Sequence, residues 1–242
     1  MALALQICSC LVWFPLEILT INAILRCGVR NYPLILTYMV VTFLLALVEV
    51  PIAISYHLRN QTEGEWFQLL HSVGECVTHV FILAIVVSLI YQATSRLGPR
   101  RLVRLAVVGG WLSFIGISLL IHYDKKRNLG NWMAPWTRDL HFAAAILDLG
   151  LWALLLGSRK KDSRLLLLAG GMGIMFAGEA VGESVRTLAI QKRSYGVFLF
   201  GNSLMTLADS SFLYVWWQTF KKEAAGRLPG SHKDARSAVY GD

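Results

Sequence analysis

The chain has 242 residues, of which 55% are hydrophobic and 16% are charged, and its mean hydropathy is +0.53. Because soluble domains carry roughly a quarter charged residues, this composition excludes an ordinary soluble domain and indicates an integral membrane protein. The formal net charge of +8 does not indicate a nucleic-acid partner, because the basic residues lie in breaks between apolar runs and are better explained by anionic lipid headgroups.

The apolar residues form seven segments along the chain, each about twenty residues long, which is the length of a membrane-spanning helix. Only helices and closed barrels satisfy every backbone polar group in lipid, and the shorter alternating pattern of barrel strands is absent from the sequence. We therefore predict an all-α membrane protein, a seven-transmembrane-helix bundle. The predicted helices cover residues 3–26, 33–57, 67–93, 102–122, 139–157, 164–190 and 196–220.

The first segment has no Lys or Arg before it, so it lacks the charged start of a signal peptide and is expected to remain as a helix. Residues 1–220 are then one transmembrane domain. Residues 221–242 form a basic tail with little apolar content, which is predicted to be disordered. The four cysteines, Cys8, Cys10, Cys27 and Cys76, lie within or at the ends of apolar segments, so no disulfide framework is expected.

The distribution of Lys and Arg predicts the orientation, because cytoplasmic loops carry the excess. Fifteen basic residues fall on the side of the C-terminus and eight on the other side. We therefore expect the N-terminus outside, the C-terminus in the cytoplasm and a multi-pass protein of the cell membrane. The short loops suit a bacterial inner membrane, and the tail could bind a protein partner as well as anionic lipid.

One exterior loop, residues 123–139, is unusually basic and aromatic. Its notable residues are Lys125, Lys126, Arg127, Trp132 and Trp136, which we call the lid loop. One interpretation is an amphipathic connector whose tryptophan rings lie at the headgroup level. The other is a lid whose cations face an anionic ligand above a binding site.

Many ionisable residues lie inside the predicted helices. A charged side chain near the centre of a bilayer costs at least ~2.5–3.5 kcal/mol, so such residues require a partner or a purpose. Their distances from the helix ends, at about 1.5 Å per residue, place most of them in the outer half of the bundle. We predict that they converge on one polar cavity that is open to the exterior. Its candidate residues are Glu49, His71, Glu75, His79, His141, Asp148, Glu179, Glu183 and Asp209.

Spacing groups some of these residues on single helix faces. His71, Glu75 and His79 are four residues apart and turn by only about 40° per step, so they occupy one stripe. For Glu183 with Arg186, the preferred interpretation is a structural ion pair within one helix. Glu17, the single acid of the first segment, is interpreted as a hydrogen-bonded packing residue. The small-residue step formed by Gly178 and Gly182 predicts close helix packing, and so do three glycines of the fourth segment. Those three are Gly109, Gly110 and Gly116.

Three functional hypotheses follow. The first is proton-linked transport, or sensing, of a small molecule or ion, because His and carboxylate groups inside membranes are typical of proton relays. The second is a metal-dependent membrane enzyme that binds zinc or iron through Glu75 and His79, with His71 or His141 and an acid from the sixth predicted helix, although neither a His-Glu-x-x-His nor a Glu-x-x-His motif occurs. The third is a haem-carrying subunit, with axial ligands His79 and His141, or His71 and His122.

The seven-helix outline with an exterior N-terminus resembles the rhodopsins, which hold retinal through a lysine in the last helix. Residues 196–220 contain no lysine. They also contain no histidine, unlike the seven-helix zinc hydrolases related to ceramidases and adiponectin receptors. The resemblance is therefore limited to topology.

Overall fold

The computed structural model describes residues 2–28, 32–58, 64–94, 100–123, 129–157 and 162–227. These residues form seven helices and no strand. The helices are α1 (Ala2–Cys27), α2 (Pro33–Leu58), α3 (Glu65–Ala93), α4 (Arg100–His122), α5 (Leu129–Gly157), α6 (Ser163–Gln191) and α7 (Tyr195–Arg227).

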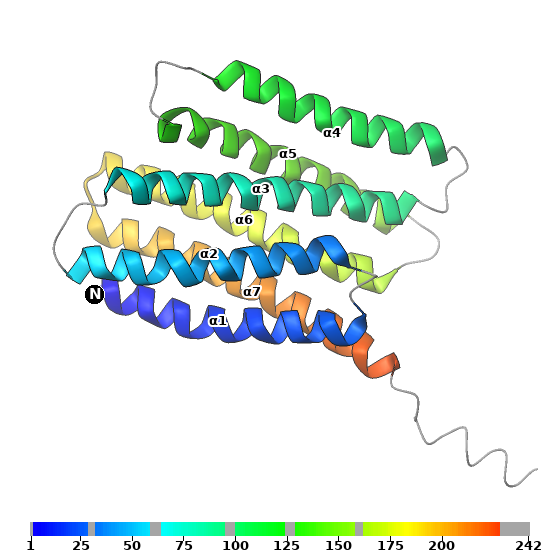
Figure 1. Cartoon of the computed structure of the whole chain (residues 1–242), viewed down its shortest axis with the longest axis horizontal. Coiled ribbons are helices and arrows are strands. Elements are labelled where there is room, and N and C mark those ends of the chain that lie inside the picture. The colour runs from blue at the N-terminus through cyan, green and yellow to red at the C-terminus, as the bar shows by residue number, and fades with distance from the viewer. Residues whose placement is uncertain are drawn as a thin grey trace, which may run out of the picture.

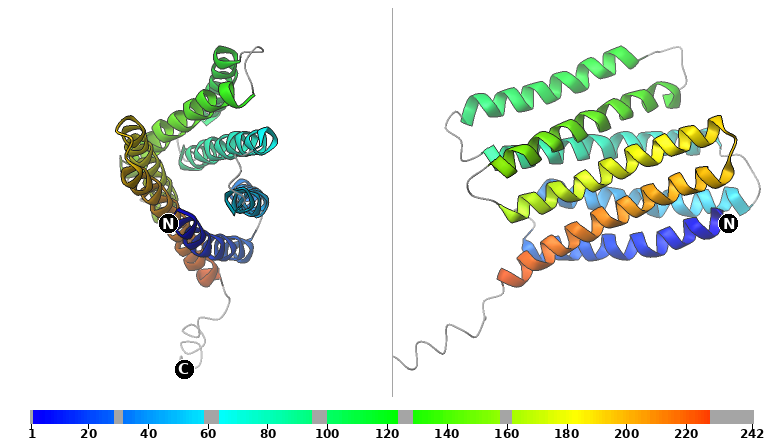
Figure 2. Two further views of the ribbon diagram at one scale, coloured as in Figure 1. Left: turned by 90° about the vertical axis from the view of Figure 1, so that its left-hand side faces the viewer. Right: turned by 180° about the vertical axis from the view of Figure 1, so that it is seen from behind.

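Successive helices run in opposite directions, side by side (Figure 1). We call the end where α1, α3, α5 and α7 begin the amino end of the bundle, and the opposite end the carboxyl end. Seen along the bundle axis, α6 and α7 lie on one side and α2 and α3 on the other, while α4 lies at the edge beyond α5 (Figure 2). This arrangement leaves α1, α2, α3, α6 and α7 around one central region.

The apolar character of the helices is compatible with a multi-pass membrane protein. Of the described helices, five are long and apolar enough to cross a membrane, namely α1, α2, α3, α5 and α6. Large apolar side chains such as Leu44, Leu120, Leu149 and Leu207 are exposed on the outer faces, each by more than half of its surface. A soluble protein rarely exposes so much apolar surface, whereas lipid covers it without penalty.

Helices α6 and α7 pack closely because glycines form their contact. A Cβ atom on Gly178 would lie 2.0 Å from the Cβ of Ala208, and one on Gly182 would lie 2.3 Å from Cγ of Met205. No side chain fits at either position, so the backbones approach to a distance that only glycine permits. The close packing predicted for this pair of glycines is confirmed.

The corresponding prediction for α4 is wrong. A Cβ added to Gly109, Gly110 or Gly116 would meet no described atom within 4 Å. Helix α4 lies at the edge of the bundle beyond α5 (Figure 2), and its neighbours among the described helices are α5 and α3, so a glycine on its remaining faces has no helix to approach. A spacing of small residues permits close contact but does not create a partner.

The carboxyl half of the bundle is a packed apolar core. Trp216 and Phe220 of α7 are fully buried together with Ile24 of α1 and Leu168 of α6. The Trp216 Nε1–H donates a hydrogen bond of 3.0 Å to the carbonyl of Leu168, which satisfies the one polar group of the largest side chain. Dense packing of this kind holds helices together in lipid, where the hydrophobic effect does not.

Helix α7 continues to Arg227, so the predicted boundary at residue 220 is corrected. Glu223, in the additional turns, accepts hydrogen bonds from the Tyr32 hydroxyl at 2.9 Å and from Arg164 Nη1 at 3.2 Å. The Arg164 guanidinium also lies 5.2 Å from the centroid of the Tyr32 ring. These contacts hold the end of α7 against α2 and α6. The rest of the predicted tail, residues 228–242, lies outside the described residues.

Helix α5 begins at Leu129, ten residues before the predicted start. The sequence obscured this start because Gly130, Asn131 and Pro135 are typical of loops. A proline removes only one backbone hydrogen bond, and membrane helices tolerate it. Trp132 and Trp136 of the lid loop therefore belong to α5. Its basic residues Lys125, Lys126 and Arg127 lie outside the described residues.

Candidate functional site

A cavity of about 250 Å³ lies between α1, α2, α3, α6 and α7. Ionisable side chains from all five helices line it. They are Glu17, Glu49, His71, Glu75, His79, Glu179 and Asp209. The remaining wall is mainly apolar and includes Trp13, Met39, Ile82, Met175, Phe212 and Leu213. The cavity thus brings together acids that are far apart in the sequence.

Helix α3 supplies one continuous stripe of the wall. His71, Glu75, His79 and Ile82 follow one another at intervals of three or four residues, which is the repeat of one helix face. Gly74, next to this stripe, leaves room for the Glu49 carboxylate, because a Cβ there would lie 2.9 Å from Oε1 of Glu49. The stripe therefore faces α2 across the cavity.

The mouth of the cavity is formed by His71 between two carboxylates. Its Nδ1 lies 3.1 Å from Oε2 of Glu49, and its Nε2 lies 3.4 Å from Oε1 of Glu75. The side chains of His71 and Glu75 are 52% and 47% exposed, so this part of the cavity is open. A neutral imidazole donates from one nitrogen only, and the imidazolium ion donates from both. The arrangement of two facing carboxylates therefore suits the protonated ring.

The deep wall contains Glu17, which is fully buried. Its Oε1 lies 2.5 Å from the hydroxyl of Thr42 on α2, and its Oε2 has no hydrogen-bond partner among the described residues. The interpretation of Glu17 as a hydrogen-bonded residue agrees with this contact, but its place in the cavity wall was missed. The signal in the sequence was that no other ionisable residue on the first helix could pair with Glu17, which indicates a partner or a purpose on another helix.

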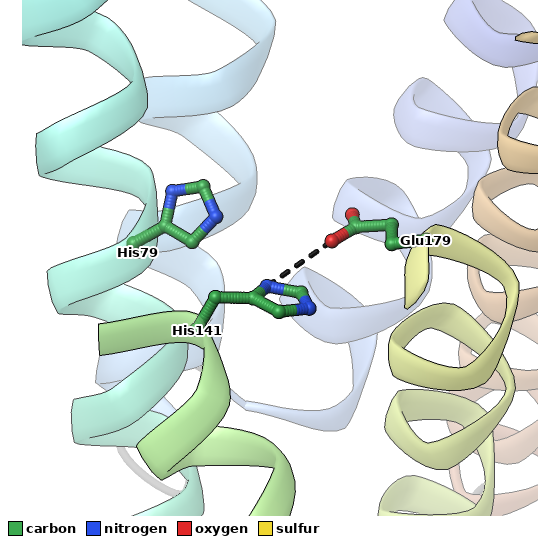
Figure 3. A group of neighbouring side chains, drawn as sticks. All are labelled: His79, His141 and Glu179. Atoms are coloured by element: carbon green, nitrogen blue, oxygen red, sulfur yellow. Dashed lines mark ion pairs between the residues drawn. The ribbon is translucent and has the colours of Figure 1, made fainter. Parts of the chain in front are cut away.

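A second group lies where α3, α5 and α6 meet, and it contains His79, His141 and Glu179 (Figure 3). His141 Nδ1 is 3.1 Å from Oε2 of Glu179, and the two imidazole rings meet edge to face with centroids 5.3 Å apart. One nitrogen from each histidine and one carboxylate oxygen all lie within 4.8 Å of one another. Among the described residues, these three side chains form a group of His and Glu ligands that could hold a metal ion.

The corrected start of α5 explains why this group can form. His141 lies twelve residues from Leu129, so it is about 18 Å from the amino end rather than near the first turn. Glu179 is also twelve residues from that end of its helix, at Gln191, and His79 is fourteen residues from Glu65. The three residues therefore occupy similar depths on three neighbouring helices.

Three predicted site residues do not line the cavity: His141, which belongs to the second group, and Glu183 and Asp148. Glu183 is 60% exposed and pairs with Arg186 at 3.1 Å, which is the intrahelical ion pair that the sequence also allowed. Asp148 is buried at 3% exposure against α6, where its Oδ2 would lie 3.5 Å from a Cβ on Gly173. Its Oδ1 has no hydrogen-bond partner among the described residues. Both positions share a helix face with a site residue but point to a different neighbour.

The group of side chains that could hold a metal differs from the predicted set in lacking Glu75. Glu75 directs its carboxylate to His71, while its backbone carbonyl lies 2.7 Å from Nδ1 of His79. Glu179, an acid of the sixth helix, lies next to the two histidines.

The geometry does not favour a haem between either predicted pair of histidines. The His79 and His141 rings touch directly, which leaves no space for a macrocycle between them. His122 lies 2.8 Å from Asp139 of α5, which also accepts a hydrogen bond from Ser118, while His71 faces α2. The His122–Asp139 pair, which sequence reasoning missed, joins α4 to α5 outside the cavity.

Comparison with known proteins gives no family for this chain: no protein family, no curated protein and no solved structure matches it.

Proposed function

We propose that the chain is a seven-span protein of the cell membrane, with the amino end of the bundle outside and the carboxyl end in the cytoplasm. The alternation of the seven helices and the excess of Lys and Arg at the carboxyl end support this topology. We place the protein in a bacterial inner membrane, with residues 1–220 as its transmembrane domain. The polar character of α7 and the basic start of α4 are compatible with both helices spanning the membrane.

Helix α7 is not among the described helices that are apolar enough to cross a membrane, but four of its hydroxyl groups are satisfied within the helix. The hydroxyls of Ser203, Thr206, Ser211 and Thr219 each donate to the carbonyl four residues earlier in the helix. Such bonds remove the need for water and allow hydroxyl residues inside a bilayer. The sequence of α4 has no Asp, Glu, Lys or Arg from Leu105 to His122, and the three arginines before that run, Arg100, Arg101 and Arg104, are placed where anionic headgroups would bind them.

We further propose that the cavity binds a cation, for proton-linked transport or for ligand sensing. The observation that carries this proposal is the excess of acids, because five carboxylates and two imidazoles line one space. Acids held together in a medium of low dielectric repel one another, and a bound cation or proton relieves that repulsion. The volume of about 250 Å³ lies just below the usual range for ligand pockets, which favours a small ion or a small organic cation.

His71 at the mouth links cation binding to protonation. The charged groups that face its ring among the described residues are Glu49 from α2 and Glu75 from α3. When the ring loses a proton, one of its two nitrogens can no longer donate to the carboxylate beside it. Rising pH therefore weakens the contact between α2 and α3 and frees negative charge for a cation.

Transport and sensing differ in what the carboxyl half must do. The buried core around Trp216 and Phe220 separates the cavity from the carboxyl end. Transport requires this core to open, whereas sensing requires only a change in helix packing. A sensor would pass its signal to a protein partner, for which the basic cytoplasmic tail is the candidate contact.

The test uses the purified protein in lipid nanodiscs and compares Zn²⁺, Mg²⁺ and tetramethylammonium as probes. We expect at least one of them to raise the unfolding temperature, more strongly at higher pH. Glu49→Gln and Asp209→Asn should reduce the effect, while Glu183→Gln, outside the cavity, should retain it. Equal shifts in all variants would contradict the proposal. A pH-sensitive dye inside proteoliposomes then separates transport, which acidifies or alkalinises the lumen, from sensing.

A metal-dependent membrane enzyme is the second candidate, because two imidazoles and a carboxylate from different helices lie together beside the cavity. Zinc or iron suits such ligands, and a bound metal can activate water for hydrolysis. This candidate predicts zinc-dependent or iron-dependent turnover of ester or amide substrates that is lost in His141→Gln. Metal binding without turnover on such substrates would favour transport or sensing.

A further inference from the structure

We infer that His79, His141 and Glu179 form a binding site for one divalent transition-metal ion of the zinc type. The inference rests on the proposed function to the extent that this ion is the cation of the cavity. It is carried by the arrangement of the three side chains and by the partners of each histidine.

His79 is held with one nitrogen available. Its Nδ1 lies 2.7 Å from the carbonyl oxygen of Glu75, and a carbonyl can only accept, so Nδ1 carries the proton. The lone pair is then on Nε2. Histidines that bind metals usually donate their other N–H to a carbonyl or a carboxylate in this way, which fixes the tautomer and the ring orientation.

His141 approaches Glu179 without forming a hydrogen bond. Its Nδ1 is 3.1 Å from Oε2 of Glu179, yet this buried atom has no hydrogen-bond partner among the described residues. A buried nitrogen without such a bond is costly unless another group binds it. Phe176 packs edge-on against the His141 ring, with centroids 5.0 Å apart, and this contact limits rotation of the ring. The imidazole is therefore oriented beside the carboxylate in a way that a shared cation explains.

The spacing fits a metal after a small contraction. Zinc bonds of about 2.0–2.2 Å in tetrahedral geometry put ligand atoms about 3.3 Å apart. The His141–Glu179 distance of 3.1 Å already meets this value, and no pair in the group exceeds 4.8 Å. No pair of ligand atoms therefore has to close by more than about 1.5 Å. Side-chain rotation is enough for a movement of this size, and three ligands leave a fourth position for water or another ligand.

The donor set selects the class of metal. Two imidazoles and one carboxylate suit zinc or iron, whereas Mg²⁺ and Ca²⁺ prefer sites made of oxygen alone. One carboxylate and two neutral imidazoles leave one positive charge on the bound ion. Glu75 and Asp209, which line the same cavity, lower the cost of that charge.

The experiment measures binding of Zn²⁺ and of Co²⁺, each supplied alone, to the full chain in nanodiscs. Metal analysis gives the stoichiometry, and the visible absorption of Co²⁺ reports four-coordinate binding. We expect one ion per chain in the wild type and an affinity lower by about tenfold or more in His79→Gln, His141→Gln and Glu179→Gln. His122→Gln, at the pair outside the cavity, is the matched control and should bind as the wild type does.

Helicity and size-exclusion profiles establish that each variant is folded. If the Gln variants do not fold, His141→Cys serves instead, because a thiolate is a zinc ligand and should keep four-coordinate Co²⁺ with a shifted absorption spectrum. Loss of four-coordinate Co²⁺ in a folded His141→Cys protein would overturn the inference.

Other outcomes separate this inference from the proposed function. If the wild type binds tetramethylammonium or Mg²⁺ but no Zn²⁺ or Co²⁺, the metal site is wrong and the cation cavity stands. If Glu49→Gln weakens Zn²⁺ binding and His141→Gln does not, the ion binds at the mouth and the ligand assignment is wrong. If none of the cations binds, both proposals fail.

Discussion

Replacement of Gly178 by alanine tests the packing that positions the candidate site. In the structure the new Cβ would lie 2.0 Å from the Cβ of Ala208 and 3.5 Å from the backbone Cα of that residue. Carbon atoms pack at about 3.5–4.0 Å, so α6 and α7 would have to separate by about 1.5–2 Å. Because Ala208 has no flexible side chain that could move aside, the helices themselves must shift.

We expect Gly178→Ala to lower the free energy of unfolding by about 3 kcal/mol, which is the upper end of the range for overpacking substitutions. At 1.4 kcal/mol per factor of ten, this lowers the folding equilibrium constant by roughly a hundredfold. Glu179 is the next residue, so the shift should also displace its carboxylate from His141 and weaken cation binding.

Gly116→Ala is the matched control, because a Cβ at Gly116 meets no described atom within 4 Å. Alanine there should be neutral, or stabilising by up to about 1 kcal/mol through its higher helix propensity. Equilibrium unfolding of the wild type and both variants in mixed detergent micelles, followed by helicity, gives the two free-energy differences. If Gly178→Ala is as stable as Gly116→Ala, the close contact inferred between α6 and α7 is wrong.

Three further predictions follow from other contacts. Thr42→Val should destabilise the protein by about 1–3 kcal/mol, because it removes the hydroxyl beside the buried Glu17. Thr42→Ser keeps a hydroxyl and should retain most of the stability. Equal losses of stability for both variants in chemical denaturation would contradict this role of Thr42. Glu223→Gln should cost about 1 kcal/mol through weaker bonds to Tyr32 and Arg164, and an unchanged unfolding temperature would show that α7 is not held there. In a cysteine-free background, a membrane-impermeant maleimide added to intact cells should label a cysteine at position 60 and not one at position 158; the reverse pattern would invert the proposed topology.

The sequence by itself predicts the helices well, because the length of each apolar run is a local property. Six of the seven predicted helices begin within two residues of the observed start. The exception is α5, whose first turns contain Gly130, Asn131 and Pro135. These residues favour loops in water, and only the pairing of α5 with neighbouring helices decides that they continue the helix.

The sequence also identifies the chemistry of the candidate site, because ionisable residues inside apolar segments are conspicuous. Helical spacing correctly places His71, Glu75 and His79 on one stripe of the cavity wall. The same reasoning includes Glu183 and Asp148, which face other neighbours, and leaves out Glu17. Spacing within one helix cannot distinguish these cases.

What the tertiary structure alone decides is which faces meet. The contact of His79 with His141 and Glu179 joins three helices, and it depends on how each helix rotates and slides against its neighbours. Those rotations follow from packing far from the site, such as the fit of Gly178 and Gly182 against α7 and the burial of Trp216 against α6. A periodic pattern defines a face but carries no information on the angle at which two faces meet, because that angle is set by the shapes of both helices together.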